Sequence, residues 1–398
     1  MRPVARHGPS WLRTTTTPLL TPARFFSGPL GRSLRAFSTE AAAHPANKIQ
    51  VYLSRSADPL LNLSVEHRLL QVTPPDSTVL LLYVNAPSVV FGRNQNPWLE
   101  ASLSRLARLA RGADAPAALG PVQLVRRRSG GGTVFHDAGN VNFGVICPPA
   151  AFDRDRYARM VVRALHALGR PSTRVNARHD IVVDGAAGAS FKVSGSAYKL
   201  TRLRSLHHGT CLLRSPNLDA ISGLLRSPAE PFIKARGVDS VRSPVRNLDL
   251  DCADFEDAVV EQFRRVHGHV HLQADFDGGA LDVERIRSGY EELQSPKWTY
   301  GQTPRFSFCT HPFPEDPRPR PRLPFDLKVR FEARHGLIDE FDVQGGSHRV
   351  DASALVGLDL HRVRDWSERL AQAGLGDADA AEVGAWMNKV LGADFTSA

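Results

Sequence analysis

A proline-rich run near residue 311 sets the strongest limit on how this chain can fold. Six of the fourteen residues from His311 to Pro324 are prolines, and charged residues are interspersed among them. Proline lacks a backbone N–H and fixes φ, so this run can form neither a helix nor an inner strand. We therefore expect an extended linker at 311–324. A large folded region over 46–310 would precede it, and a small accessory domain over 325–398 would follow.

The patterns on both sides of the linker mix strands and helices. Before it, apolar periodicity predicts strands at 49–53, 79–85, 88–92, 180–183, 190–193 and 209–213, and helices at 62–70, 153–169, 253–267 and 283–293. Residues 100–120 are expected to form a short helix followed by a surface loop. After the linker, a hairpin over 325–343 and helices near 351–373 and 379–392 predict a small α+β unit.

The first 37 residues have a composition of their own. They contain six arginines and no lysine, aspartate or glutamate, which is typical of a mitochondrial transit peptide. Arginine stands three positions before a cut after Phe37, and 24–27 carries a competing copy of the same pattern. We therefore predict import into the mitochondrial matrix and removal of 1–37. The alternative is a disordered basic tail with no targeting role.

The remaining composition excludes several classes of protein. The net charge is +9, but without those six arginines 44 basic residues face 41 acidic ones, leaving +3. A nucleic-acid interface would need a clustered basic surface, so this class is disfavoured. No apolar run of about 18 residues is present, which argues against a membrane span. The four cysteines show no zinc-ligand spacing, and their scatter suggests a reducing compartment.

A glycine-rich motif is the densest chemical signal. Arg126, Arg127 and Arg128 are followed by Ser129, three consecutive glycines and the run Thr133-Val134-Phe135. Glycines let backbone amides approach an anion closely, and the arginines add charged donors. The motif therefore predicts a phosphate cradle, although it matches neither a Walker loop nor a dinucleotide fingerprint. On its own, such a turn can equally be structural.

A second cluster surrounds Lys192. This lysine lies in an apolar, strand-like run with small neighbours, where it needs an anionic partner or a depressed pKa. The alternative is a half-exposed strand lysine whose ammonium reaches water. His207 and His208 follow fifteen residues later, with no third ligand at metal spacing. They are therefore read as hydrogen-bonded structural histidines.

Together these motifs resemble lipoate-protein ligase A. The resemblance runs in one order over about 50–398, through 92–98, 127–140, 192–199, 207–210, 237–243, 301–304 and 385–387. It implies an α/β (α+β) catalytic domain over 46–310 related to biotin protein ligases, with a small α+β C-terminal lid domain. It also implies that ATP activates lipoate or octanoate to acyl-AMP, from which the acyl group passes to a protein lysine.

The same resemblance implies roles for individual residues. Lys192 would be catalytic and would contact both the acyl carbonyl and the phosphate. Nucleotide contacts would come from Arg127, Gly132, Thr133, Val134, Phe135 and Lys192. The acyl group would be bound by Lys192, Arg93, Asn96 and His208. Asp180 would offer a hard oxygen ligand to Mg²⁺. The implied partners are lipoyl-acceptor domains of 2-oxoacid dehydrogenase complexes and the glycine-cleavage H protein, with no nucleic acid and no membrane.

Some features depart from the family pattern, and alternatives stay open. Arg128 stands where a small residue is frequent, Pro244 interrupts the 237–243 motif, and 100–121 is longer than usual. The main alternative is an ATP-independent transferase that moves the acyl group from a carrier such as H protein. A cysteine-dependent transferase would need Cys211 as nucleophile, and a catalytically silent docking protein would not need Lys192.

Overall fold

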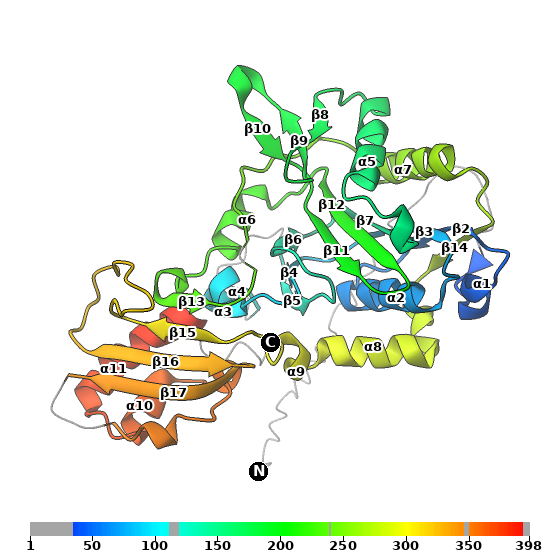
Figure 1. Ribbon diagram of the computed structural model, residues 1–398. Coiled ribbons are helices and arrows are strands. Elements are labelled where there is room, and N and C mark those ends of the chain that lie inside the picture. The colour runs from blue at the N-terminus through cyan, green and yellow to red at the C-terminus, as the bar shows by residue number, and fades with distance from the viewer. Residues whose placement is uncertain (1–34, 111–118, 239, 346–349, 393–398) are drawn as a thin grey trace, which may run out of the picture. The chain divides into compact units, whose positions relative to one another are not determined.

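The computed structural model describes residues 35–110, 119–238, 240–345 and 350–392, which fall within one compact unit. Its centre is a seven-stranded mixed sheet in the order β1-β14-β2-β3-β7-β12-β11 (Figure 1). The strands are β1 (Arg35–Ala36), β14 (Leu272–Phe276), β2 (Ile49–Ser54), β3 (Thr78–Val84), β7 (Asn140–Cys147), β12 (Ser205–Leu212) and β11 (Ser196–Leu200). From β1 to β3 neighbouring strands run parallel, and from β3 to β11 they run antiparallel.

Helices cover both faces of this sheet because its central strands are apolar on both sides. Leu80 and Leu82 of β3 pack in the cluster that holds α5 (Arg156–Ala167) and α7 (Cys252–His267). Leu81 and Tyr83 of the same strand point to the opposite face, into the cluster of α1 (Thr39–Ala43), α2 (Pro59–Val72) and α8 (Glu284–Gln294). Figure 1 shows these two helical layers on either side of the sheet.

The described residues also form three smaller sheets. The first contains β10 (Ser190–Lys192), β9 (Ile181–Asp184) and β8 (Thr173–Val175), and the second contains β5 (Gln123–Arg126), β4 (Ser88–Phe91) and β6 (Val134–His136). The third has the order β13 (Ile233–Ala235), β15 (Phe306–Cys309), β16 (Lys328–Arg334) and β17 (Leu337–Gln344). It packs with α10 (Trp366–Gln372) and α11 (Asp377–Met387). The remaining helices are α3 (Pro97–Glu100), α4 (Leu103–Ala110), α6 (Leu218–Leu224) and α9 (Pro296–Thr299).

The proline-rich segment does not occupy the place expected from the sequence. It connects β15 to β16, which are adjacent antiparallel strands of one sheet, so 311–324 is a connection inside that sheet. The segment is also packed rather than fully extended into solvent. Buried Asp316 accepts hydrogen bonds from Arg318 and Arg320, and Arg320 donates to the Cys309 carbonyl at 3.0 Å. The C-terminal sheet therefore takes strands from both sides of the expected boundary.

Most other expected elements agree with the structure within a few residues. The strand predictions match β2, β3, β4, β9, β10 and β12, and the predicted helices match α2, α5, α7 and α8. The helix expected at 351–373 is wrong over its first half, because Gly357 adopts a positive φ and only 366–372 is α-helical. The loop expected after α4 falls largely outside the described residues. Among the described helices, none is long and apolar enough to span a bilayer.

Residues 1–34 of the predicted transit peptide also lie outside the described part of the chain. The last residues before the expected cut are described. Arg35 and Ala36 pair in parallel with Ala274 and Asp275 of β14. The Phe37 ring lies 5.9 Å from the ring of Tyr52 and 6.3 Å from that of Phe276, centre to centre. Phe37 therefore contributes to the core of the large domain.

Candidate functional site

Two cavities meet at Lys192. The larger has a volume of about 860 Å³ and the smaller about 210 Å³. Seven residues line both cavities: Thr133, Val134, Lys192, Gly195, Thr210, Ser240 and Val241. Lys192 is thus placed to contact a group in either cavity, which suits a site that joins two parts of one reaction.

A buried carboxylate fixes the Lys192 ammonium. Lys192 ends β10, and its Nζ lies 2.9 Å from Oδ1 of Asp180. Asp180 precedes β9, and its backbone N–H donates to Asn176 Oδ1 at 3.1 Å. Because β9 and β10 pair antiparallel, the sheet brings the two residues together. The side chain of Asp180 is 8% exposed, so this ion pair is weakly screened by water.

The glycine-rich loop is shaped by Arg127. The Arg127 guanidinium donates to the carbonyls of Gly130 and Gly132, at 2.6 and 2.8 Å from Nη2. It also donates to the Val90 carbonyl at 3.1 Å. Three backbone carbonyls therefore accept hydrogen bonds from the one buried guanidinium of Arg127. Burial lowers the pKa of Arg127 to about 10, so the guanidinium stays charged at neutral pH.

The loop has no room for larger residues at two glycines. Gly131 has φ +86°, and a Cβ there would lie 2.9 Å from Arg127 Nη2. A Cβ on Gly92 would lie 2.0 Å from the Gly131 carbonyl oxygen. Close backbone approach therefore requires glycine at both positions.

Arg126 joins the loop to two other sequence motifs. Its fully buried guanidinium donates to the carbonyls of Arg93 and Gln95 at 3.0 and 2.7 Å, and to the Thr299 carbonyl at 2.7 Å. It also donates to Thr303 Oγ1 at 3.1 Å. The 92–98 and 301–304 motifs thus converge on one arginine, and they brace the strand that precedes the glycines.

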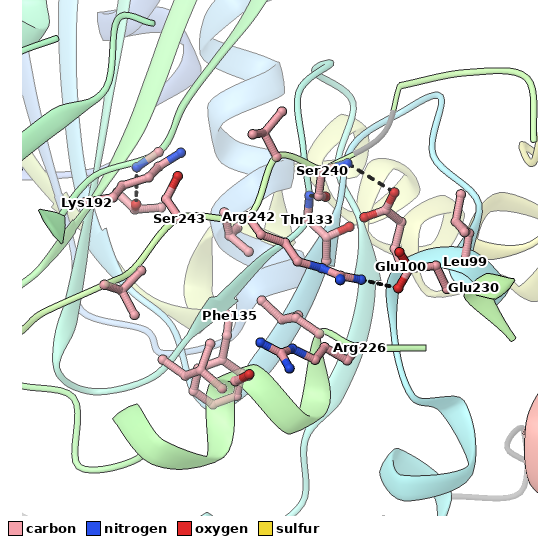
Figure 2. Close-up of a pocket in the computed structure, with 18 of the residues that line it drawn as sticks. Leu99, Glu100, Thr133, Phe135, Lys192, Arg226, Glu230, Ser240, Arg242 and Ser243 are labelled. Carbon is pink, nitrogen blue, oxygen red and sulfur yellow. Dashed lines mark hydrogen bonds and ion pairs between the residues drawn. The ribbon is translucent and has the colours of Figure 1, made fainter. Parts of the chain in front are cut away.

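Ser240 of the 237–243 motif lies beside Thr133 of the loop, as Figure 2 shows. Ser240 Oγ accepts the Thr133 N–H at 2.8 Å, and the Ser240 N–H donates to Glu100 Oε1 at 3.3 Å. Gln95 bridges both elements. Its Oε1 accepts from Thr133 Oγ1 at 2.8 Å, and its Nε2 donates to Ser240 Oγ at 3.1 Å.

A buried hydrogen-bond chain connects the smaller cavity to the glycine loop. His208 Nδ1 lies 3.0 Å from Glu66 Oε2, and His208 Nε2 lies 2.7 Å from Ser129 Oγ. Since a carboxylate only accepts, the bond between these two side chains runs from His208 Nδ1 to Glu66. Ser129 Oγ in turn accepts from Arg127 Nε at 3.0 Å. The orientation of His208, which lines the cavity, is therefore tied to that of Arg127.

Other polar groups of the smaller cavity are held in neutral form. Burial lowers the pKa of His136 to about 3, and nearby Arg127 adds to this effect. Burial also raises the pKa of Tyr83 well above its usual value, with Glu66 beside it. Apolar Leu63, Val90 and Ala197 complete much of the wall. The cavity thus combines these neutral groups with the charged side chains of Arg127, Arg178, Asp180 and Lys192.

The larger cavity extends from Lys192 toward α6 and β13. Leu218, Ile221 and Leu225 form an apolar side, and Figure 2 shows Arg226 and the Arg242–Glu230 ion pair among its charged groups. Asp316, Pro317 and Arg318 of the proline-rich segment add a further wall. This mixture of apolar surface and cationic groups suits a ligand with a flat apolar part and an anionic part.

The structure gathers most of the predicted site residues. Arg127, Gly132, Thr133, Val134, Phe135, Asp180, Lys192 and His208 each line at least one cavity. Arg93 and Asn96 line neither. Arg93 lies 4.3 Å from the centre of the Trp298 ring and donates to Gln302, and Asn96 caps α3 through the Trp98 N–H. Both therefore lie outside the two cavities.

The structure describes the surroundings of the predicted magnesium ligand Asp180 and of the alternative nucleophile Cys211. Among the described residues, no three His, Cys, Asp or Glu side chains gather as a metal site, and Asp180 is paired with Lys192. Cys211 is fully buried, and burial raises the pKa of its thiol, which makes it a poor nucleophile. All four cysteines are free.

Sequence reasoning did not single out Glu66, Ser129 or Ser240. Glu66 offered one weak signal, as the one acidic residue of α2. A buried carboxylate needs a partner, and that partner is His208.

Comparisons with known proteins find relatives of this chain. Residues 58–264 match the family model of the lipoyl protein ligase A/B catalytic domain. The human mitochondrial lipoyl amidotransferase LIPT1 is 34% identical over 312 residues, covering 74% of this chain and 76% of that protein. Lipoate-protein ligase A of Psychrobacter cryohalolentis is 33% identical over 271 residues, covering 65% of this chain and 74% of that protein.

A solved structure confirms the predicted fold. The crystal structure of Plasmodium falciparum LipL1 in complex with lipoate superposes with a TM-score of 0.51 at 19% identity. The match covers 85% of this chain and 99% of that chain. The predicted biotin/lipoate-ligase-like α/β fold is therefore confirmed.

Proposed function

Because this chain belongs to the lipoate-protein ligase and lipoyltransferase family, we propose that it attaches lipoate or octanoate to a lysine of lipoyl-acceptor domains. We further propose that ATP activates the acid first, which gives acyl-AMP. The observation that carries this proposal is the position of Lys192, which lines both cavities beside a glycine-rich loop.

The first step would form a mixed anhydride. A carboxylate oxygen of the acyl substrate attacks the α-phosphorus of ATP, the bond to the bridging oxygen breaks, and pyrophosphate leaves. Negative charge accumulates on the phosphate in this step, and the Lys192 ammonium offsets it from a fixed position. The glycine-rich loop, whose Gly130 and Gly132 carbonyls are held by Arg127, supplies the neighbouring backbone surface.

The second step would transfer the acyl group. The neutral amine of the acceptor lysine attacks the acyl carbonyl carbon, an amide bond forms, and AMP leaves with the anhydride oxygen. The amine proton passes to solvent or to the departing phosphate. We assign the acyl chain to the smaller cavity. Lys192 borders that cavity as well, so it again faces the developing negative charge, now on the carbonyl oxygen.

Magnesium fits this site only together with a nucleotide. Among the described residues, Asp180 is the only carboxylate that lines the smaller cavity, and Lys192 occupies one of its oxygens. Mg²⁺ takes six oxygen ligands and is commonly held by one or two carboxylates plus substrate phosphates. We therefore propose that Asp180 contributes one oxygen, while ATP phosphates and water supply the others. The ion would neutralise phosphate charge.

A second candidate function uses no ATP. The human relative is named a lipoyl amidotransferase and aligns over 74% of this chain. In this alternative, an acyl group passes from a carrier such as glycine-cleavage H protein to the lipoyl domain of a 2-oxoacid dehydrogenase. We favour the ligase because the chain keeps the loop that would hold a nucleotide phosphate.

We also propose the mitochondrial matrix as the site of action. The first 37 residues are rich in arginine and free of acidic residues, and the human relative carries a mitochondrial name. The acceptors would be the lipoyl domains and H protein of that compartment.

One assay separates the two candidate functions. Purified protein is incubated with an unmodified lipoyl domain, Mg²⁺ and octanoate or lipoate, with ATP present or omitted, and acyl-AMP and pyrophosphate are quantified. The ligase predicts both products and an acylated domain only with ATP. Acyl passage from octanoylated H protein without ATP, with no acyl-AMP in any reaction, would establish the transferase instead. Lys328→Ala, which removes an exposed lysine outside both cavities, serves as the matched control for Lys192→Ala.

A further inference from the structure

We propose that residues 241–246, here called the rim segment, form the docking surface for an acidic face of the acceptor protein. This proposal rests on the proposed function, because it concerns the protein that supplies the acceptor lysine. The rim segment consists of Val241, Arg242, Ser243, Pro244, Val245 and Arg246.

The rim segment lies directly beside the reactive lysine. The Lys192 backbone N–H donates to the Pro244 carbonyl at 2.8 Å, and Lys192 forms an isolated parallel β-bridge with Val245. Val241 lines both cavities, and Val245 lines the larger one. A protein that covers the rim segment would therefore place its own surface at the mouth of the site, where an acceptor lysine has to enter.

Exposed apolar side chains gather at this mouth. Val241 is 60% exposed and Val245 is 39% exposed. With Val238 they make up three of the seven exposed large hydrophobic side chains among the described residues. Single exposed valines need no explanation, but such a group beside a reactive centre is typical of an interaction surface.

The charged groups of the rim segment are arginines. Arg242 is paired with Glu230, whereas the Arg246 guanidinium lies 4.0 Å from the centre of the Phe191 ring. Among the described residues, Arg246 forms no ion pair with a carboxylate, and it lines neither cavity. A nucleotide bound inside the cavities would leave this arginine at the surface. Its chemistry instead fits a carboxylate presented from outside, because a guanidinium binds carboxylates in a bidentate manner.

The Phe191 ring pre-organises the Arg246 guanidinium as a hydrogen-bond donor. Stacking on Phe191 restricts the guanidinium, so less side-chain freedom is lost when a carboxylate binds. The expected partner surface therefore has aspartate or glutamate near the acceptor lysine, with an apolar contact facing Val241 and Val245. Docking of this kind acts mainly through electrostatic complementarity and weakens as salt increases.

The test compares a protein acceptor with a small nucleophile. Arg246→Glu and Arg246→Ala are assayed for transfer to an unmodified lipoyl domain and, separately, to hydroxylamine. Hydroxylamine attacks the same acyl carbonyl but has no docking surface. Arg265→Glu is the matched control, because Arg265 is an exposed arginine of α7 whose side chain is 66% exposed.

We expect Arg246→Glu to lower kcat/KM for the lipoyl domain roughly tenfold, with a smaller loss for Arg246→Ala. Transfer to hydroxylamine should not change, and the salt dependence of kcat/KM should become shallower. Equal kcat/KM for both variants and the parent protein would overturn the docking surface alone. The docking surface would also be overturned if light scattering showed that the parent protein is a dimer and that Arg246→Glu dissociates it without a selective loss of lipoyl-domain transfer. If the parent protein acylates neither the lipoyl domain nor hydroxylamine with any acyl donor, the proposed function fails as well.

Discussion

The Glu66–His208 pair gives the most quantitative prediction of the structure. His208 is buried, and its two ring nitrogens lie 3.0 Å from Glu66 Oε2 and 2.7 Å from Ser129 Oγ. Replacing His208 by Ala leaves a buried carboxylate and a buried hydroxyl without their partner. Removing the partner of a buried carboxylate leaves an uncompensated charge, which typically costs about 3 to 5 kcal/mol. We therefore expect His208→Ala to lower the free energy of unfolding by about that amount.

A double-mutant cycle isolates the interaction from other effects of the substitutions. Glu66→Gln, His208→Ala and the double variant are unfolded with urea, and the coupling energy is calculated from the four free energies of unfolding. We expect a coupling of about 1.5 to 3 kcal/mol. The control pair is His179 and Asp155, whose Nδ1 and Oδ1 atoms lie 2.6 Å apart and whose side chains are 34% and 21% exposed. For this pair we expect a coupling energy of less than about 1 kcal/mol. Equal coupling in the two pairs would refute the reasoning.

Three further predictions concern the loop, the core and the N-terminus. Gly131→Val should abolish acyl-AMP formation, measured by chromatography, because the new Cβ would meet Arg127. Gly169→Val is the control and should retain acyl-AMP formation, because Gly169 also has a positive φ but a Cβ there has no neighbour within 4 Å. Burial raises the pKa of Glu256 from 4.5 to about 7, so parent stability falls as pH rises through this window, by at most roughly 3 kcal/mol. Glu256→Gln should therefore exceed the parent in stability near pH 8 and lose this advantage near pH 5 in urea titrations; a pH-independent difference would contradict this. A chain that starts at Ser38 lacks β1 and the Phe37 ring. Its free energy of unfolding, measured by urea denaturation, should be about 1 to 2 kcal/mol lower than that of a chain that starts at Arg35. Equal stability would contradict a core role for Phe37.

The sequence could predict which motifs form the site but not how each residue is used. Arg127 illustrates this limit. Arginine beside glycines suggests a direct phosphate contact, yet two of its N–H donors bind the carbonyls of Gly130 and Gly132. Whether an arginine faces its own loop or a ligand depends on tertiary packing, which local spacing does not encode. Glu66 was missed for a related reason, since its partner lies 142 residues away on β12.

The proline-rich segment shows a similar limit for the fold. Its composition correctly excludes regular structure, but it does not show where the segment lies. Asp316 holds Arg318 and Arg320 with hydrogen bonds of 2.7 Å each, which folds the run against β13 and β15. The strong hydrogen bond from Arg318 also lowers the pKa of Asp316 far below its usual range. A linker composition is thus compatible with a packed connection when its charges find partners.

The intact mass of a lipoyl domain tests the central claim most directly. An unmodified domain is incubated with Mg²⁺, ATP and octanoate, together with the parent protein, Lys192→Ala, Lys192→Arg or the control Lys328→Ala. We predict the mass of one octanoyl group on one lysine with the parent and with Lys328→Ala. Both Lys192 variants should lose at least about 3 kcal/mol of transition-state stabilisation, more than a hundredfold in rate. Near-normal acylation by folded Lys192→Ala, or no acylation by the parent with either ATP or an acylated carrier, would contradict the account.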